Sequence, residues 1–230
     1  MEKFLKKTNE NTFISKNLSG FVTPAGEVFL TDPYKLLIKR GVDLAISLFL
    51  LVFVLSWLFP LLAVLIKISS PGPILFKQNR HGKGNKIFLC YKFRTMRLNP
   101  DADVKQASKH DSRITKIGRF LRRSSLDELP QVINVLKGEM SLIGPRPHAV
   151  PMNYAFSKEI DNYMFRHVVK PGITGLAQSK GYRGEIRHFF DIYGRVKLDH
   201  FYIKKWCLAL DLKIIVWTIH TLFFKNKKAY

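Results

Sequence analysis

Acidic residues are scarce in this sequence. It carries 17 Asp and Glu against 38 Lys and Arg, which gives a formal net charge of +21 and a pI near 10.1. This imbalance predicts an anionic partner, and the candidates are nucleic acid, anionic lipid headgroups and phosphorylated small molecules. Because 47% of the residues are hydrophobic, the charge does not indicate a disordered tail. A chain of 230 residues can bury one substantial core or two small ones.

Cysteine is nearly absent as well. The two cysteines, Cys90 and Cys207, lie far apart, and neither has a Cys or His neighbour at the spacing of metal ligands. Both stand in apolar runs, so we expect two buried thiols and no need for an oxidising compartment. The first forty residues are polar and charged, without an early apolar stretch, so we expect no cleavable signal peptide.

Charge is missing altogether from residues 44–66. These 23 residues form a helix of about 35 Å at a rise of about 1.5 Å per residue, enough to reach across a hydrocarbon core. Pro60 inside the stretch removes one backbone hydrogen bond and predicts a kink, for which the Ser56 hydroxyl can partly compensate. Lys and Arg flank both ends, which favours a helix that dips into the membrane and returns to the same face. An ordinary single span with a tolerated proline fits the pattern equally well.

Three further segments have recognisable patterns. Residues 74–76 and 87–93 flank a Gly-rich turn and predict a β-hairpin, and Met152 to Val169 predicts a helix. Apolar residues recur at helical spacing between Arg113 and Arg123 among basic ones, which predicts a basic amphipathic helix in the headgroup layer. A solvated charged face over a small core is the alternative for that helix.

Asp127 and Glu128 form the only adjacent pair of acidic residues, and they stand in the most basic part of the chain. A carboxylate pair among guanidinium groups stays ionised, which suits chemistry on a phosphate ester or a bound metal ion. Ser125 and Glu128 also satisfy a helix capping box, although Pro130 favours a slightly later helix start. Either way the pair lies at a helix N-terminus, where backbone N–H groups favour anions. The local pattern alone does not separate capping from catalysis.

Four blocks follow the proline-broken helix in a fixed order: Lys92–Met96 (KFRTM), Leu126–Gln131 (LDELPQ), Ser141–Pro147 (SLIGPRP) and Lys170–Gly175 (KPGITG). Together they resemble the bacterial sugar transferase family, the small monotopic phosphoglycosyl transferases, over roughly residues 34–224. Further blocks at Pro147–Val150, Gly181–Glu185 and Tyr202–Lys213 resemble the branch that transfers hexose-1-phosphates for exopolysaccharides. Small members usually have Ser directly before the proline, whereas this chain has Phe59.

The resemblance implies transfer of a sugar-1-phosphate from a UDP-hexose, with glucose or galactose favoured, to undecaprenyl phosphate, with release of UMP. It implies that Asp127 is the nucleophile of a covalent phosphosugar intermediate. Glu128 would help to hold Mg²⁺, with Asp127 as the other metal ligand, or would assist the incoming lipid phosphate. An ionised carboxylate needs no base to activate it, but cations must offset the repulsion between two anions.

The resemblance also suggests roles for other residues. Arg146, held between Pro145 and Pro147, is expected to clamp a phosphate, with Lys92 and Arg94 as further phosphate ligands. A solvated strand edge explains Lys92 equally well, and a surface ion pair explains Arg183 and Glu185 almost as well. The residues expected to lie near the nucleotide or sugar are Thr174, Gln178, Arg183 and Glu185.

The expected fold is mainly α with a small β-hairpin (α+β). We divide the chain into a polar arm (1–35), a membrane-dipping helix (36–70), a compact cytosolic catalytic domain (71–200) and a C-terminal interfacial helix (201–230). The apolar run from Phe201 to Phe224 in this last segment could equally be core. We expect it at the cytoplasmic face of the bacterial inner membrane, in contact with lipid, and compatible with a homodimer. A non-catalytic basic membrane adaptor is one alternative. The other is a nucleic-acid-binding protein, although no nucleic-acid module pattern is visible.

Overall fold

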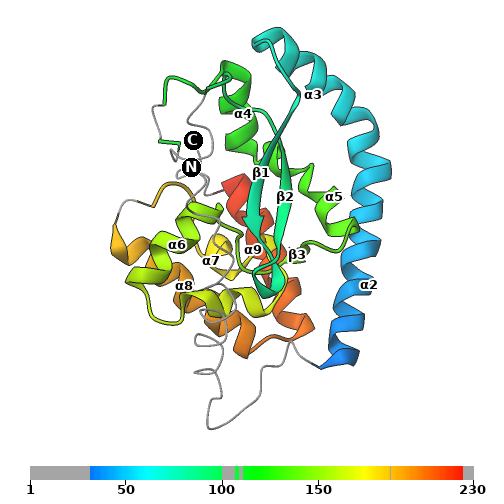
Figure 1. The fold of residues 1–230 in the computed structure, drawn as a ribbon. Coiled ribbons are helices and arrows are strands. Elements are labelled where there is room, and N and C mark those ends of the chain that lie inside the picture. The colour runs from blue at the N-terminus through cyan, green and yellow to red at the C-terminus, as the bar shows by residue number, and fades with distance from the viewer. Residues whose placement is uncertain (1–31, 100–106, 109–110, 187, 225–230) are drawn as a thin grey trace.

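The computed structural model describes residues 32–99, 107–108, 111–186 and 188–224 (Figure 1). Its elements are mainly helical, with two small sheets, as the sequence predicts. In chain order they are α2 Pro33–Phe49, η3 Leu50–Leu55, α3 Ser56–Ser69, β1 Leu75–His81, η4 Lys83–Asn85, β2 Ile87–Phe93, α4 Lys116–Ser124, η5 Leu126–Glu128, α5 Gln131–Leu136, β3 Ser141–Ile143, α6 Val150–Glu159, η6 Tyr163–Val168, β4 Gly172–Thr174, α7 Leu176–Ser179, α8 Phe189–Lys204 and α9 Leu208–Phe224. The predicted arm, residues 1–35, lies almost wholly outside the described residues.

The apolar segment forms one long helix from Pro33 to Ser69, long and apolar enough to cross a membrane by length and composition. It contains the π-helical turn η3, which the sequence pattern did not predict, followed by Pro60 within α3. The Ser56 hydroxyl donates to the Val52 carbonyl at 2.6 Å, one turn before the Ser56 carbonyl that Pro60 leaves without its helical donor, so this contact does not replace the missing bond. Phe59, which stands where small family members have Ser, packs its ring against Phe93. Figure 1 shows α2 and α3 curving over one side of the molecule.

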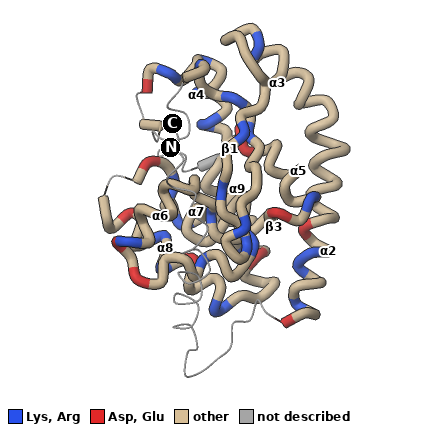
Figure 2. The backbone as a smooth tube through the Cα atoms, in the orientation of Figure 1, with Lys and Arg blue, Asp and Glu red and all other residues tan. Residues whose placement is uncertain are grey.

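This helix has two different faces. Figure 2 shows no charged residue along the central part of the helix. The outward face is a stripe of exposed apolar side chains: Leu48, Phe49, Val52, Phe53, Trp57, Leu61, Val64 and Ile68. Its inward face buries Leu55, Leu62 and Ile66 in a cluster with Phe93 and Val132. At roughly 2 kcal/mol for each fully buried aliphatic side chain, this contact holds the helix against the domain.

Both ends of the long helix are fixed to the same domain. Near the start, Lys39 pairs with Asp211 of α9 at 2.7 Å, and Arg40 donates to the carbonyls of Val135 and Leu136 at the end of α5. Beyond the other end, the guanidinium of Arg94 donates to the carbonyl of Ser70 at 2.7 Å. The rest of the described chain therefore holds the helix near both of its ends.

The predicted hairpin is confirmed. Strands β1 and β2 pair antiparallel from Leu75 opposite Phe93 to His81 opposite Ile87, so the first strand is longer than predicted. A second sheet, the parallel pair β3–β4, was not predicted because each strand has only three residues. At this sheet Gly172 lies so close to Gly144 that a Cβ on Gly172 would be 2.1 Å from the Gly144 nitrogen. That close approach sets the start of the loop that carries Arg146.

Several expectations need correction. The segment from Met152 to Val169 is not one helix: α6 ends at Glu159, and Asn162 takes a φ of 60° before the separate turn η6. Cys207 is exposed, although Cys90 is buried as predicted.

The boundary at residues 200/201 falls inside α8, and much of the segment after it belongs to the core. Its buried members, which pack with Phe165 and Ile143, are Tyr202, Ile203, Trp206 and Ile214. The basic amphipathic helix forms as α4, with Leu121 buried and Phe120 58% exposed. That arrangement is consistent both with a headgroup-layer helix and with a solvated face.

Candidate active site

The acidic pair lies on a short 3₁₀ turn, η5, directly after α4. Ser125 takes a left-handed conformation, with φ 58°, and its side chain caps no helix, so the predicted capping box is wrong. Helix α5 begins only at Gln131, as Pro130 had indicated. Gly118 allows α4 to come close to the segment that follows β2, because a Cβ there would lie 1.9 Å from the Thr95 carbonyl oxygen. The pair is thus placed between the end of α4 and the hairpin.

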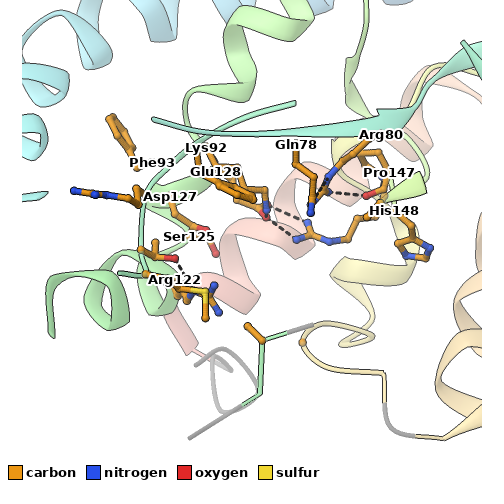
Figure 3. A pocket seen from close by; sticks show the side chains of 18 of the residues that line it. Gln78, Arg80, Lys92, Phe93, Arg122, Ser125, Asp127, Glu128, Pro147 and His148 are labelled. Atoms are coloured by element: carbon orange, nitrogen blue, oxygen red, sulfur yellow. Dashed lines mark hydrogen bonds and ion pairs between the residues drawn. The ribbon is translucent and has the colours of Figure 1, made fainter. Parts of the chain in front are cut away.

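Glu128 is held by two cations from different parts of the fold. Lys92 of β2 lies 2.6 Å from its Oε1, and Arg146 donates from Nη2 to Oε1 at 2.6 Å and from Nη1 to Oε2 at 3.1 Å (Figure 3). Burial by itself would raise the pKa of Glu128, but Arg146 and Lys92 together lower this pKa well below its usual value. Glu128 is therefore ionised, and both of its oxygens accept hydrogen bonds.

Asp127 has a different environment. Its carboxylate has no hydrogen-bond or ion-pair partner among the described residues, although it is only 9% exposed. Burial and the negative charge of Glu128 raise the pKa of Asp127 to about 6, against the opposing charges of Lys92, Arg122 and Arg146. At neutral pH Asp127 is thus a mostly ionised carboxylate that no side chain of the described region binds directly.

Asp127 and Glu128 line a cavity of about 420 Å³. Among the described residues, two carboxylates line this cavity, those of Asp127 and Glu128, together with nine Lys and Arg side chains: Arg80, Lys92, Arg94, Arg97, Arg113, Arg122, Arg146, Arg183 and Arg195. The side chains of Arg97, Arg122, Arg183 and Arg195 have no carboxylate partner among the described residues. This excess of positive charge suits a ligand with several phosphoryl charges.

A buried polar network supports the cavity wall behind Arg146. Arg166 is 2% exposed, binds Asp199 through Nε at 3.0 Å and Nη2 at 2.7 Å, and donates from Nη2 to the Arg146 carbonyl at 2.8 Å. Tyr163 and His148 join the same network, with 2.6 Å between the Tyr163 hydroxyl and His148 Nδ1. The network fixes the backbone of the loop from Gly144 to His148, and hence the position of Arg146.

Comparison with known proteins decides the family. Residues 34–225 match the family described as bacterial sugar transferase. The chain belongs to the bacterial sugar transferase family. Its relatives include a UDP-glucose:undecaprenyl-phosphate glucose-1-phosphate transferase of Xanthomonas campestris pv. campestris, 52% identical over 74% of this chain and 36% of the relative. A protein of the same description from Escherichia coli (strain K12) is 46% identical over 84% of this chain and 42% of its own length.

The chain spans about two fifths of the length of these two relatives. The exopolysaccharide production protein PSS of Rhizobium leguminosarum bv. phaseoli matches along more of its own length. It is 42% identical over 80% of this chain and 94% of its own length. Membership of this sugar transferase family favours an enzyme over the adaptor and nucleic-acid-binding alternatives.

Most of the predicted site residues of this sugar transferase lie together. Those that line the cavity are Asp127, Glu128, Lys92, Arg94, Arg146, Pro147, Gln178 and Arg183. Thr174 and Glu185 do not line it, and the Thr174 hydroxyl lies 2.8 Å from that of Thr218 in α9. Arg94 reaches the cavity, but its terminal nitrogens donate to the carbonyls of Ser70 and Pro71. Arg94 therefore has a structural role at the end of α3, and its phosphate contact stays a prediction.

Sequence reasoning missed part of the site. Arg122 donates from Nε to the Thr95 hydroxyl at 2.8 Å and stands beside Asp127, yet in the sequence it is one basic residue among many. Arg195 and His148 also line the cavity, from α8 and from the loop after β3. No spacing rule connects α8 with Asp127, because the fold alone brings them to one cavity.

Proposed function

We propose that this protein transfers a hexose-1-phosphate from a UDP-hexose to undecaprenyl phosphate and releases UMP. The single observation that carries the proposal is the contrast between the two adjacent carboxylates. Glu128 is bound by Lys92 and Arg146, whereas Asp127 has no such partner and faces the same basic cavity. The names of the Xanthomonas and Escherichia relatives, which act on UDP-glucose and undecaprenyl phosphate, support the same reaction.

The chemistry follows from this contrast. The Asp127 carboxylate attacks the sugar-bearing phosphorus, a new O–P bond forms, and the bond to the bridging oxygen breaks with its electron pair leaving on UMP. The attack brings an anion against an anion, so cations must lower the barrier. Arg146, Lys92 and Arg122 surround the attacking group, and removal of one such electrostatic group costs roughly 10²–10³ in rate. In the second step the phosphate of the lipid displaces Asp127 from the same phosphorus.

Glu128 has a supporting role in this mechanism. Its charge holds Lys92 and Arg146 in place, and without it these two cations would repel each other beside Asp127. This role differs from the metal-ligand role expected for Glu128, because both of its oxygens already accept hydrogen bonds from cations.

Mg²⁺ fits the site through Asp127. Magnesium is often held by one or two carboxylates together with substrate phosphates. Asp127 is the cavity carboxylate that no Lys or Arg side chain of the described region binds directly. A bound Mg²⁺ would neutralise charge on the diphosphate. Arg146 and Lys92 orient the same phosphates from the protein side.

We further propose that the protein is monotopic, at the cytoplasmic face of the inner membrane. The long helix is bound to one domain near both of its ends, through Lys39–Asp211 and through Arg94 to Ser70. A spanning helix would carry these two ends to opposite sides of the bilayer. Its apolar outward stripe suits insertion into one leaflet, which would hold the cavity near the lipid phosphate.

Glucose is our first choice of sugar and galactose the second. The two relatives described first carry glucose in their names, and a Streptococcus agalactiae relative is described as a galactosyl transferase. Purified enzyme in detergent should be assayed with UDP-glucose, UDP-galactose and UDP-N-acetyl sugars against undecaprenyl phosphate. A galactose preference would correct the sugar and leave the reaction intact.

The reaction itself is tested without acceptor. With UDP-glucose alone, the enzyme should release about one UMP per active site, and Asp127→Asn should abolish this burst while leaving membrane association unchanged. Asp161→Asn, an exposed carboxylate outside the cavity, is the matched control and should keep the full burst. An active Asp127→Asn enzyme would exclude the proposed nucleophile.

A further inference from the structure

Arg195 is a buried arginine of the cavity wall whose charge is met by no ion pair within the described part of the chain. It lies on α8 and is only 6% exposed. Its Nη2 donates to the carbonyl of Gly184 at 2.9 Å, while its Nε–H is buried without a hydrogen-bond partner. A buried guanidinium that no carboxylate contacts directly is costly, and an anionic ligand in the cavity would complete its hydrogen bonding.

The surroundings of Arg195 differ from those of its neighbour Arg166. Arg166 is neutralised by two hydrogen bonds to Asp199. Burial, with the charges of Arg146 and Arg166, lowers the pKa of Arg195 to about 10, against the opposing charges of Asp191 and Asp199. The guanidinium of Arg195 therefore stays charged at neutral pH, although no carboxylate of the described region pairs with it directly.

The side chain of Arg195 is held ready by close packing. The ring of Tyr182 covers Gly194, where a Cβ would lie 2.5 Å from Tyr182 Cε1. This contact docks the loop that contains Gly184 onto α8, and the hydrogen bond from Arg195 to Gly184 joins the same two segments. Little ordering of the side chain is then needed when a ligand enters, which favours binding.

Arg195 acts on His148, because the charge of Arg195 is among those that lower the pKa of His148. In Figure 3, Asp127 is at one side of the cavity, His148 is at the other, and Glu128 with its ion-pair partners lies between them. The charges that act most on Arg195 are those of Arg146, Arg166, Asp191 and Asp199, whereas those that act most on Asp127 are Lys92, Glu128, Arg122 and Arg146. Arg195 therefore belongs to the part of the cavity away from the proposed nucleophile.

We propose that Arg195 binds the phosphate of the departing UMP. This inference rests on the proposed function. In phosphoryl transfer the attacking and leaving oxygens are roughly in line, so the leaving group lies across the phosphorus from Asp127. When the Asp127–phosphorus bond forms and the bond to the bridging oxygen breaks, the phosphate of UMP gains one negative charge, and no proton has to move. A fixed cation on that side stabilises the transition state more than the bound substrate.

The test compares Arg195→Gln with Lys197→Gln in the full chain, purified in detergent. Lys197 is the matched control, because it lies on the same helix, loses the same charge and is exposed outside the cavity. The measurements are the inhibition constant of UMP, the rate of the UMP burst without acceptor, and the thermal shift caused by UMP. Arg195→Gln should weaken UMP inhibition by about 10- to 100-fold, as expected for one lost charge-assisted hydrogen-bond contact.

The remaining readouts separate ligand binding from a structural role. Without UMP, Arg195→Gln should melt no lower than the wild type, because a buried charge with no direct ion pair is removed, and its UMP-induced thermal shift should be lost. Lys197→Gln should match the wild type throughout. If Arg195→Gln fails to fold, Arg195→Lys serves instead, and a folded Lys variant should still bind UMP several-fold more weakly, since Lys lacks the planar fork of Arg.

Wild-type UMP affinity and burst rate in the Arg195 variant would overturn the inference and leave the proposed function standing. A wild-type enzyme that releases no UMP from UDP-sugars would instead overturn the proposed function.

Discussion

Neutralising Asp127 and neutralising Glu128 should change stability in opposite directions, although the two residues are adjacent. The pKa of Asp127 is raised from 3.8 to about 6 in the folded protein, chiefly by burial. Each unit of pKa difference corresponds to about 1.4 kcal/mol, so ionised Asp127 destabilises the fold by up to about 3 kcal/mol at pH 7 and above. Asp127→Asn removes this penalty and should raise the melting temperature by about 6–12 °C for a domain of this size.

The pH dependence gives the sign of this effect. A raised carboxyl pKa means that the folded state binds more protons than the unfolded state between about pH 4 and 6. The stability contribution of Asp127 therefore falls as pH rises through this window and is constant above it. The advantage of Asp127→Asn should accordingly be largest at pH 7–8 and vanish near pH 4.

Glu128→Gln should do the reverse. It leaves Lys92 and Arg146, which are both partly buried, without their shared carboxylate. Breaking a buried ion pair by removing one partner costs about 3–5 kcal/mol, and the lower end applies because 29% of the Arg146 side chain is exposed. Because the pKa of Glu128 lies below that of the free side chain, its contribution is present above about pH 4.5 and lost as pH falls.

The assay is thermal unfolding in detergent at pH 7.5 and at pH 4, at one fixed scan rate. Glu159→Gln, an exposed carboxylate of α6, is the control and should match the wild type at both pH values. A destabilised Asp127→Asn protein, or a Glu128→Gln protein as stable as the wild type, would refute the conclusion that cations bind Glu128 directly and leave Asp127 without a partner.

Three further changes have defined outcomes. The kcat/KM of the UMP-releasing step should fall tenfold per pH unit below about pH 6 and level off above it, because only ionised Asp127 attacks; a flat profile from pH 5 to 7.5 would contradict this. Gly118→Ala should destabilise the fold by about 2–3 kcal/mol in the same unfolding assay, since its Cβ would lie 1.9 Å from the Thr95 carbonyl oxygen. Gly84→Ala has open space around its Cβ, so it should lose only the stability that corresponds to the backbone strain of an alanine at a φ of 64°. Arg166→Met should lower the free energy of unfolding by about 3–5 kcal/mol, because it leaves the buried Asp199 unpaired. Adding Asp199→Asn should restore part of this free energy, and a double variant no more stable than Arg166→Met would contradict a stabilising Arg166–Asp199 ion pair.

The sequence predicted those parts of the fold that rest on local pattern. The uncharged run from 44 to 66, the hairpin around Gly84 and the later helix start after Pro130 all follow from composition, turn residues or the missing proline N–H. The sheet β3–β4 could not be found in this way, because three-residue strands carry no periodicity and the pairing depends on the close approach of Gly172 to Gly144.

The site was predictable where residues are close in sequence or carried by a recognised motif. Asp127, Glu128 and Arg146 do line one cavity, but the sequence did not indicate that Glu128 is bound by cations while Asp127 is not. That contrast depends on Lys92, which β2 brings to Glu128 across 36 residues of sequence. Arg94 was assigned to phosphate because its carbonyl partners at the end of α3 cannot be inferred from its position.

The most direct test of the account is to look for the covalent intermediate on the chain. Purified enzyme should be mixed with UDP-glucose in the absence of undecaprenyl phosphate, quenched, digested and examined by mass spectrometry. The account predicts one peptide that gains the mass of a hexose phosphate on Asp127, a gain that disappears when undecaprenyl phosphate is added before the quench. An unmodified Asp127 in an enzyme that turns over normally, or the sugar phosphate on another residue, would contradict it.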